Sequence, residues 1–228
     1  VWVPPGTDDT GLALGAAAWI EHLDRGPLPL HSPFLNRFDT PNDEPGEESI
    51  EEVARALIAG EIIGVCNGAG ELGPRALGHR SLLARTDSVA LRERLSERVK
   101  RREWYRPLAP ILCDEAAREV LGETAASSPL SRWMLGAWPV KPTWHRELAG
   151  VLHHDGSVRA QVVGDDGHNR WIYRLLRLLW RRDGLPALIN TSFNGPGEPI
   201  VHHHEHALPC ARKLGLDGVV IHGSLHRP

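Results

Sequence analysis

The sequence predicts a mixed α/β fold. From residue 49 to the C-terminus, short apolar runs typical of buried strands alternate with longer segments of helical period. Turns rich in glycine or proline separate the two kinds of segment. This alternation favours a sheet with flanking helices, and the sequence contains no internal repeat or low-complexity tract.

The first element of this region is expected to be a helix. Ser49 and Glu52 fit a capping box at its start, and Gly60 ends it. Further helices are expected over residues 88–100, 114–121, 169–182 and 205–214. Strands are expected over residues 62–66, 82–85, 108–112, 133–138, 158–163, 187–190 and 218–222.

The segment before residue 49 has a different character. A helix is expected over residues 12–23, and residues 25–48 are rich in Pro, Asp and Glu without a sustained period, which is typical of a linker or surface excursion. The chain opens on Val-Trp-Val in strand-like sequence, so we interpret it as a piece of a longer protein. We therefore predict two parts, residues 1–48 and 49–228.

The composition indicates in which cellular compartment the protein is expected. Its 228 residues carry a formal net charge of −3, and no apolar run approaches the roughly 20 residues that a membrane helix needs. The N-terminus lacks the pattern of a signal peptide. Cys66, Cys113 and Cys210 are widely spaced and form no Cys-x-x-Cys pair, so neither a disulfide framework nor a zinc site is indicated. We expect a soluble, cytoplasmic protein.

A glycine-rich loop over residues 67–81 follows the first expected strand and contains Arg75 and Arg80. Glycines let a backbone approach a ligand closely, and the forked donors of arginine match phosphate oxygens. The spacing fits neither the P-loop nor the dinucleotide fingerprint. A tight surface turn is therefore an equal alternative.

A second motif joins a basic helix end to an aromatic pair in Lys100-Arg101-Arg102-Glu103-Trp104-Tyr105-Arg106-Pro107. If Lys100 and Arg106 project to one side, they form a second positive wall for a phosphorylated ligand. Cations also favour the negative end of a helix, which is the alternative explanation.

A third motif surrounds Arg159. The strand expected over residues 158–163 would place Arg159 and Gln161 on one face, a charge beside an amide. An ordinary exposed hairpin face is the alternative.

A fourth motif begins where an apolar strand breaks into a polar loop. Asn190, Ser192 and Asn194 offer neutral donors and acceptors for hydroxyl, amide or phosphate groups. A turn capped by its own side chains would show the same pattern.

Four histidines lie close together at the expected start of a helix: His202, His203, His204 and His206. Their spacing matches no metal-ligand template and no Cys or carboxylate pattern completes it, so a native metal site is a minor alternative here.

Taken together, the four motifs resemble the O-carbamoyltransferase family of nodulation and antibiotic-tailoring enzymes, in order and spacing and over nearly the whole chain. The resemblance implies a C-terminal YrdC-like domain with a mixed twisted sheet and flanking helices. In the family that domain makes carbamoyl-adenylate from carbamoyl phosphate and ATP. An N-terminal domain of the actin-like ATPase superfamily transfers the carbamoyl group to a hydroxyl of a natural product or sugar.

By this resemblance, Arg75, Lys100, Arg106, Arg159 and Ser192 would line the carbamoyl-adenylation site, with Asn190 nearby. We expect Arg75, Lys100 and Arg106 to serve catalysis, with Asn190 and Ser192 holding the carbamoyl end. Mg²⁺ is expected with ATP, although the sequence indicates no carboxylate ligand for it.

Asp9 opens a segment that resembles the last motif of the N-terminal domain, where the family has an aspartate ligand of Fe²⁺. The histidines that complete that site in the family belong upstream of Val1. The resemblance therefore implies Fe²⁺ only in a complete enzyme.

Two rivals remain. The basic run from Arg92 to Arg106 suggests a non-catalytic nucleotide- or RNA-binding YrdC-like module, although the acidic overall balance argues against nucleic acid. The chain could also be a folded remnant without activity, because transfer requires the missing N-terminal domain. The sequence indicates neither the acceptor alcohol nor the oligomeric state.

Overall fold

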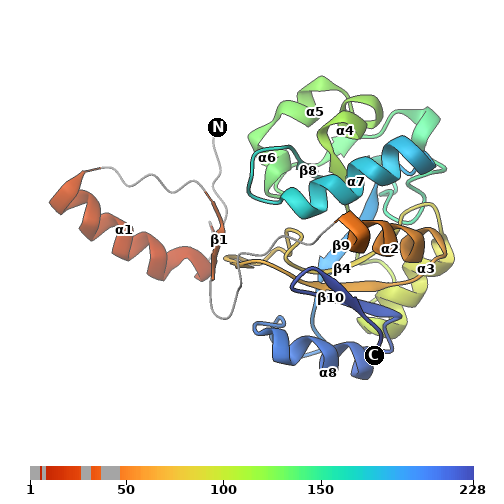
Figure 1. The fold of residues 1–228 in the computed structure, drawn as a ribbon. Helices are drawn as coiled ribbons and strands as arrows, with labels where there is room; N and C mark the ends of the chain where they lie inside the picture. The colour runs from red at the N-terminus through yellow and green to blue at the C-terminus, as the bar shows by residue number, and fades with distance from the viewer. Residues whose placement is uncertain (1–5, 7–8, 27–31, 37–46) are drawn as a thin grey trace.

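The computed structural model describes residues 6, 9–26, 32–36 and 47–228. Within them, a seven-stranded mixed sheet forms the centre of the fold (Figure 1). Its strands, in spatial order, are β11 (Ser224–His226), β10 (Gly218–Ile221), β2 (Ile63–Cys66), β4 (Arg80–Arg85), β9 (Leu188–Ser192), β5 (Ala109–Cys113) and β8 (Gln161–Val163). β10 pairs parallel to β2 and β5 parallel to β8, and the other neighbours are antiparallel.

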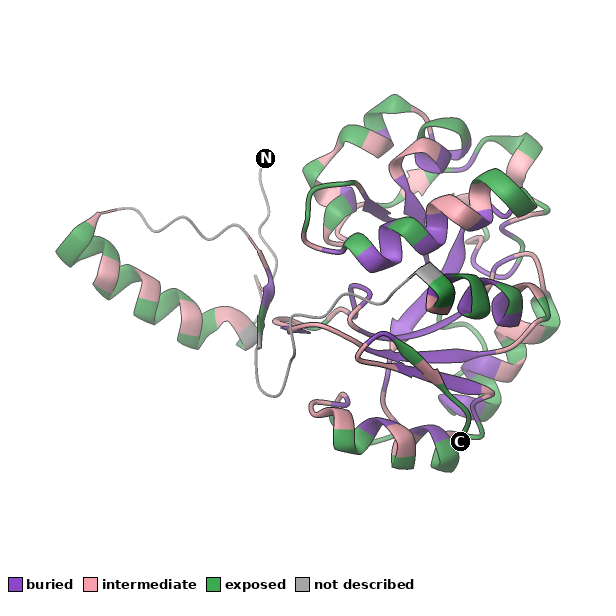
Figure 2. Cartoon of the chain, in the orientation of Figure 1, coloured by how far each residue is buried: buried purple, intermediate pink, exposed green. Residues whose placement is uncertain are grey.

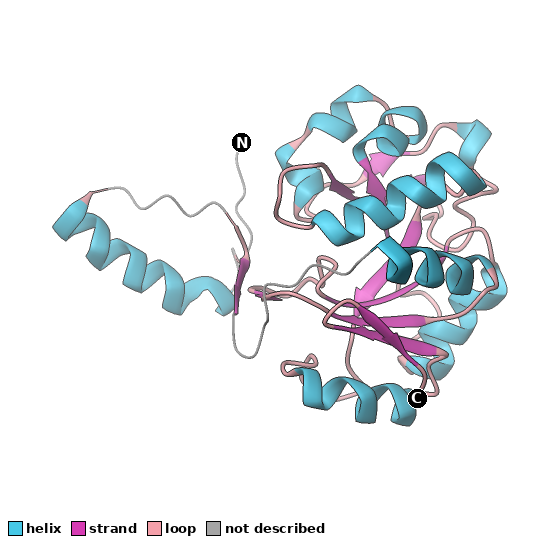
Figure 3. Ribbon diagram, viewed as in Figure 1, coloured by secondary structure: helices cyan, strands magenta, loops and turns pink. Residues whose placement is uncertain are grey.

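Helices cover both faces of this sheet, with α2 and α7 on one face and α8 on the other (Figures 1 and 3). The helices are α1 (Leu12–Arg25), α2 (Glu47–Ile58), α3 (Val89–Glu93), α4 (Asp114–Val120), α5 (Glu123–Ser127), α6 (Pro129–Arg132), α7 (Arg170–Asp183) and α8 (His204–Leu214), with a π-helix η2 (Arg94–Val99) and short 3₁₀ helices η1 (Asp9–Gly11) and η3 (Pro142–Trp144). Because both faces are covered, the central strands β2 and β5 are buried along their whole length (Figure 2).

The expected α/β alternation is confirmed for most elements. The helix before Gly60 ends in a Schellman motif: Gly60 has φ +87°, and the amides of Gly60 and Glu61 donate to the carbonyls of Leu57 and Ala56. This helix begins at Glu47, however, so Ser49 lies inside its first turn and the predicted capping box is wrong.

The predicted strand over residues 133–138 is wrong except at its end. Ser128 caps α6 by accepting a hydrogen bond from the Leu130 amide, and Pro129 occupies the first helical turn. Met134 then adopts φ +57°, which a strand does not allow. Only β6 (Trp138–Pro139) remains, paired with β7 (Ser157–Val158).

The strand expected over residues 158–163 is interrupted. β7 pairs with β6, whereas β8 belongs to the central sheet beside β5. Arg159 therefore lies in the link between two strands of different sheets, and the prediction that one strand places it on the same face as Gln161 is wrong.

The linker expected over residues 25–48 includes a strand, β1 (Phe34–Asn36), which pairs antiparallel with β3 (Gly70–Glu71). Phe34 is buried, and its ring stacks on His79 with centroids 4.0 Å apart. Residues 34–36 are thus attached to the glycine-rich loop, although a boundary near residue 48 stays a prediction.

The helix expected over residues 12–23 is present as α1, and none of its described side chains is buried (Figure 2). Its exposed apolar residues include Trp19 and Ile20. The assignment of residues 1–48 to an actin-like domain stays a prediction. Within the described segments, no helix is long and apolar enough to cross a membrane.

Candidate functional site

The predicted motifs meet at one edge of the central sheet. β9 is antiparallel to β4 and β5, so its C-terminal end lies beside the N-terminal ends of both, and β8 runs parallel to β5. The register pairs Ser192 with Ser81 and Asn190 with Ala109. Motifs far apart in the sequence therefore surround one edge of the sheet.

Glu71 folds the glycine-rich loop. One of its carboxylate oxygens accepts hydrogen bonds from the backbone amides of Leu77, His79 and Arg80 at 2.7, 2.9 and 3.1 Å. Gly78 has φ +112°, and a Cβ there would lie 2.7 Å from the Asn169 amide nitrogen. This glycine is therefore required by close approach to the protein's own side chain.

Three buried amides hold the same loop from the sheet side. Gln161 and Asn169 donate to the Leu77 carbonyl at 2.8 and 2.6 Å. Asn190 donates to the Ala76 carbonyl at 3.0 Å and to the Gln161 side chain at 2.8 Å. Among the described residues, the buried Asn190 side-chain oxygen has no hydrogen-bond partner, which is unusual for a buried polar atom.

Arg80 does not act as a phosphate ligand in this arrangement, which corrects the suggestion that both arginines of the loop serve one. Its guanidinium is buried and makes five hydrogen bonds, two to the His202 carbonyl and one each to those of Asn67, Gly68 and His79. It cross-links the loop to the segment before α8.

Lys100 is also buried and points into the polar loop after β9. Its ammonium group contacts the backbone carbonyls of Ser192 and Asn194 at 2.8 and 2.9 Å, the Ser192 hydroxyl at 3.2 Å and the Asn194 side-chain oxygen. Burial, followed by repulsion from Arg102, lowers the pKa of Lys100 to about 7. The structure thus joins Lys100 to Ser192 and Asn194, two residues of another predicted motif.

Arg75 and Arg159 come together from separate motifs. Burial lowers the pKa of Arg159 to about 10, and repulsion from Arg75 and Arg102 adds to the effect. Among the described residues, none of these three guanidinium groups forms an ion pair, and the Arg75 Nε atom is buried without a partner. We call Arg75, Arg102 and Arg159 the arginine cluster.

An unneutralised cluster of like charges is unfavourable in the free protein, and an anion in its midst relieves that repulsion. Guanidinium groups bind phosphate oxygens through paired hydrogen bonds. The arginine cluster therefore has the chemistry of a site for a multiply charged, phosphorylated ligand.

Arg106 occupies the rim of this region. Its side chain is 58% exposed and lies 3.5 Å from the Glu103 carboxylate. It is close enough to Arg102 to lower the pKa of that residue. The prediction that Lys100 and Arg106 project to one side as a single wall is wrong, because Lys100 is buried in the loop after β9.

A model of the carbamoyltransferase C-terminus matches residues 54–227. The chain belongs to this family. Nodulation protein U of Rhizobium tropici is 36% identical over 203 residues, which cover 85% of this chain and 34% of that protein. Nodulation protein NolNO of Sinorhizobium fredii is 31% identical, with 97% of this chain and 35% of that protein covered. The chain thus spans about a third of the length of these curated relatives.

The fold resembles part of full-length HypF, solved in its phosphate- and nucleotide-bound form. The TM-score is 0.54 at 18% identity, with 97% of this chain and 36% of that chain covered. HypF of T. kodakarensis gives a TM-score of 0.50 over 73% of this chain. This likeness agrees with the expected mixed α/β architecture of a carbamoyltransferase C-terminal domain.

The described residues of this carbamoyltransferase domain do not form a metal centre by themselves. Asp9 is exposed at the start of η1, and no group of three His, Cys, Asp or Glu side chains is placed to hold an ion in the part of the chain that the structure describes. One carboxylate does not fit an Fe²⁺ site, so no chemical step is assigned to iron here.

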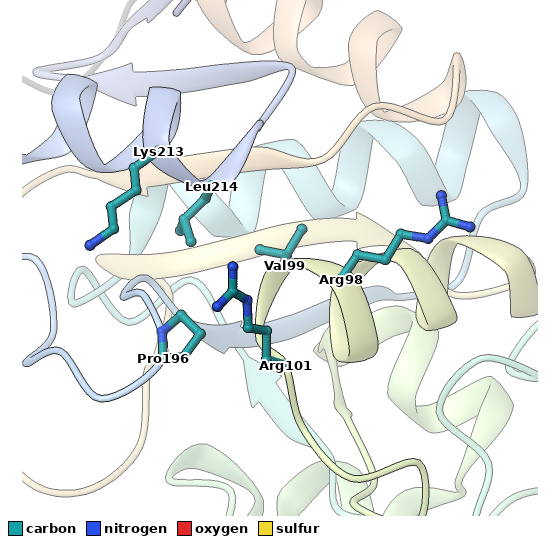
Figure 4. Close-up of a pocket in the computed structure, with 6 residues that line it drawn as sticks. All are labelled: Arg98, Val99, Arg101, Pro196, Lys213 and Leu214. Atoms are coloured by element: carbon teal, nitrogen blue, oxygen red, sulfur yellow. The ribbon is translucent and has the colours of Figure 1, made fainter.

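A small hollow lies beside the segment that carries Lys100, and Arg101 is one of the residues that line it. It has a volume of about 180 Å³ and is lined by Arg98, Val99, Arg101, Pro196, Lys213 and Leu214 (Figure 4). Figure 4 shows the Arg101 side chain extending towards this hollow, whereas Arg98 points away from it. Lys213 forms an ion pair with Glu198.

Arg102 and Glu71 were missed as individual residues by sequence reasoning, although both lie inside motifs that it singled out. A run of three cations, Lys100 to Arg102, contains no signal that distinguishes the member whose charge lowers the pKa of Arg159. For Glu71, the position in a glycine-rich loop would have suggested a carboxylate that accepts loop amides.

Proposed function

We propose that this chain catalyses the formation of carbamoyl-adenylate from carbamoyl phosphate and ATP. The observation that supports the proposal is the arginine cluster, in which Arg75 lies close enough to Arg159 to lower its pKa and neither guanidinium has a carboxylate partner among the described residues. The family membership supports the same reaction class. In the complete protein, a hydroxyl of a small-molecule acceptor would receive the carbamoyl group.

The proposed reaction consumes carbamoyl phosphate, ATP and water and yields carbamoyl-adenylate, phosphate and pyrophosphate. A carbamate oxygen forms a bond to the α-phosphorus of ATP as the bond to pyrophosphate breaks, and water supplies the oxygen that leaves with phosphate. Such steps need charge neutralisation and positioning more than a protein nucleophile.

Each residue then has a defined task in the proposal. Arg75 and Arg159 bind phosphate oxygens, and Arg106 approaches them from the rim. Lys100 fixes the loop that carries Ser192, and the unpaired oxygen of Asn190 accepts a hydrogen bond from the carbamoyl NH₂ group. Mg²⁺ would be held by the phosphates of ATP and by water, because the arginine cluster supplies no oxygen ligand.

Exchange of labelled pyrophosphate into ATP, dependent on carbamoyl phosphate, tests this function. We expect Arg75→Ala to reduce the exchange rate by about 100-fold or more, because guanidinium groups stabilise the transferred phosphates. Lys100→Ala should reduce it through disorder of the Ser192 loop. Unchanged exchange in both variants would overturn the proposal, and ATP binding without any exchange by the wild type would favour the non-catalytic nucleotide-binding alternative.

A further inference from the structure

Pro33 and Phe34 contact both ends of the glycine-rich loop, although they lie in the segment predicted as a linker. The Pro33 carbonyl accepts a hydrogen bond from the Leu72 amide at 2.7 Å. The Phe34 ring stacks on His79 with centroids 4.0 Å apart and ring planes 20° from parallel. Arg75 lies in the loop between Leu72 and His79, so these two contacts hold the loop that carries it at both ends.

His79 is itself fixed from two sides. Its Nδ1–H donates to the Ala69 carbonyl at 2.6 Å, and its backbone amide donates to the Glu71 carboxylate at 2.9 Å. A carbonyl only accepts, so Nδ1 carries a proton, and burial lowers the pKa of His79, which favours the neutral ring. Glu71 also accepts the Leu77 amide and lies opposite Phe34 in the pairing of β3 with β1. The stacked pair is therefore connected to the carboxylate that folds the loop.

Phe34 also belongs to a small hydrophobic cluster at this edge of the sheet. Its exposed fraction is 8%, and the cluster includes Leu77 of the loop and Ala109, which pairs with Asn190. Leu35, the next residue of β1, is 44% exposed. Adjacent strand residues point to opposite faces, so Phe34 faces the loop whereas Leu35 does not.

We propose that Phe34 is a positioning residue of the proposed carbamoyl-adenylation site and acts by holding the loop that carries Arg75. Residues 33–36 then belong to this site, although they precede the family match over residues 54–227. This inference rests on the proposed function for the identity of the ligand. A loop that is already ordered before binding does not lose conformational entropy when the ligand arrives, so its arginine binds more tightly.

Calorimetric titration of the full chain with inorganic pyrophosphate tests the role of Phe34 without catalysis. We expect Phe34→Ala to weaken binding by about tenfold, because the loop must then be ordered by the ligand. Phe34→Leu keeps apolar bulk in the cluster but not the stacked ring, and should give an intermediate affinity. Leu35→Ala is the matched control on the same strand and should change the affinity by less than about twofold.

A double-variant cycle with Arg75→Ala separates positioning from general destabilisation. Because Phe34 acts through Arg75, Phe34→Ala should weaken pyrophosphate binding by less than about twofold when Arg75 is already replaced. Hydrogen exchange supplies a second readout that needs no ligand. In Phe34→Ala the amides of Leu77 and His79 should exchange faster, whereas those of the central strand β5 should keep their protection.

Three outcomes would overturn the inference: wild-type protein that does not bind pyrophosphate, Phe34→Ala protein that binds it as tightly as Leu35→Ala, or an equal loss with and without Arg75. Faster exchange of the β5 amides together with those of the loop would mean that Phe34 stabilises the whole fold instead. If pyrophosphate binding depends on Phe34 through Arg75 but the wild type shows no carbamoyl-phosphate-dependent exchange of pyrophosphate into ATP, the positioning role stands and the proposed function fails.

Discussion

Two groups of cations lie at the same edge of the sheet, and their surroundings differ completely. Arg80 and Lys100 are buried and surrounded by carbonyl and hydroxyl oxygens. The arginine cluster is half-buried and has no ion-pair partner in the described part of the chain. Residue type alone does not separate a structural cation from a ligand-binding one; the difference lies in whether the protein supplies the acceptors.

The comparison predicts opposite effects on stability and on anion binding. Removal of a satisfied cation leaves buried acceptors without donors, which destabilises the fold. Removal of an unsatisfied cation relieves repulsion and should leave the fold intact while it weakens the site.

Arg80→Ala should have the largest effect on stability. We expect the free energy of unfolding to fall by roughly 3–5 kcal/mol, because four backbone carbonyls lose a charged donor in a buried setting. Denaturation in urea measures the change. Arg227→Ala is the control, since its ion pair with Glu61 is exposed and should contribute less than about 1 kcal/mol. Equal effects of the two variants would contradict the structural role of Arg80.

Arg159→Ala should show the reverse pattern. We expect pyrophosphate exchange to fall by about 100-fold, equivalent to about 2.7 kcal/mol of transition-state stabilisation, with no loss of thermal stability. The same preparation serves for exchange kinetics and for a thermal melt. A variant that melts several degrees lower would place Arg159 with the structural cations instead.

Lys100 provides a smaller, pH-dependent test. Its folded pKa of about 7 lies below its ordinary value of 10.5, so between these pH values the unfolded chain binds the extra proton. The contribution of Lys100 titration to the free energy of unfolding therefore rises with pH across that window, by at most about 1.4 kcal/mol per pH unit. Below that window this contribution is absent.

Lys100→Met removes this titration while it keeps a side chain of similar length. The difference in unfolding free energy between wild type and variant, measured from pH 6 to pH 10, should change in favour of the wild type as the pH rises. A difference that does not vary with pH would mean that the ammonium group is not desolvated by its surroundings.

Periodicity was sufficient to predict most of the central elements, because strands and helices of this sheet bury continuous apolar faces. Periodicity failed around Trp133. The apolar residues there lie in a turn that follows α6, a short helix that Ser128 caps and Pro129 begins. Arg75 and Arg159 belong to distinctive motifs and lie close enough for Arg75 to lower the pKa of Arg159, but their service in one ligand site stays a prediction.

The roles of Arg80 and Lys100 could not be predicted from sequence, since the acceptors of Lys100, and the His202 carbonyl that accepts two hydrogen bonds from Arg80, belong to residues beyond position 190. The His202 carbonyl reaches Arg80 only through the pairing of β9 with β4. The direction of Lys100 depends on backbone geometry, namely a π-turn before it and a left-handed residue after it. Neither leaves a clear pattern in the residues themselves.

The number of residues in the π-helix η2 determines the direction in which Lys100 points. Each residue of a regular helix advances the chain by about 100°, and the wider turn over Arg94–Val99 accommodates one residue more than an α-helical turn would. Deletion of a single residue there would allow the turn to tighten and would rotate Lys100 away from the Ser192 loop. Insertions and deletions in this short stretch should therefore be tolerated less well than substitutions at its exposed positions.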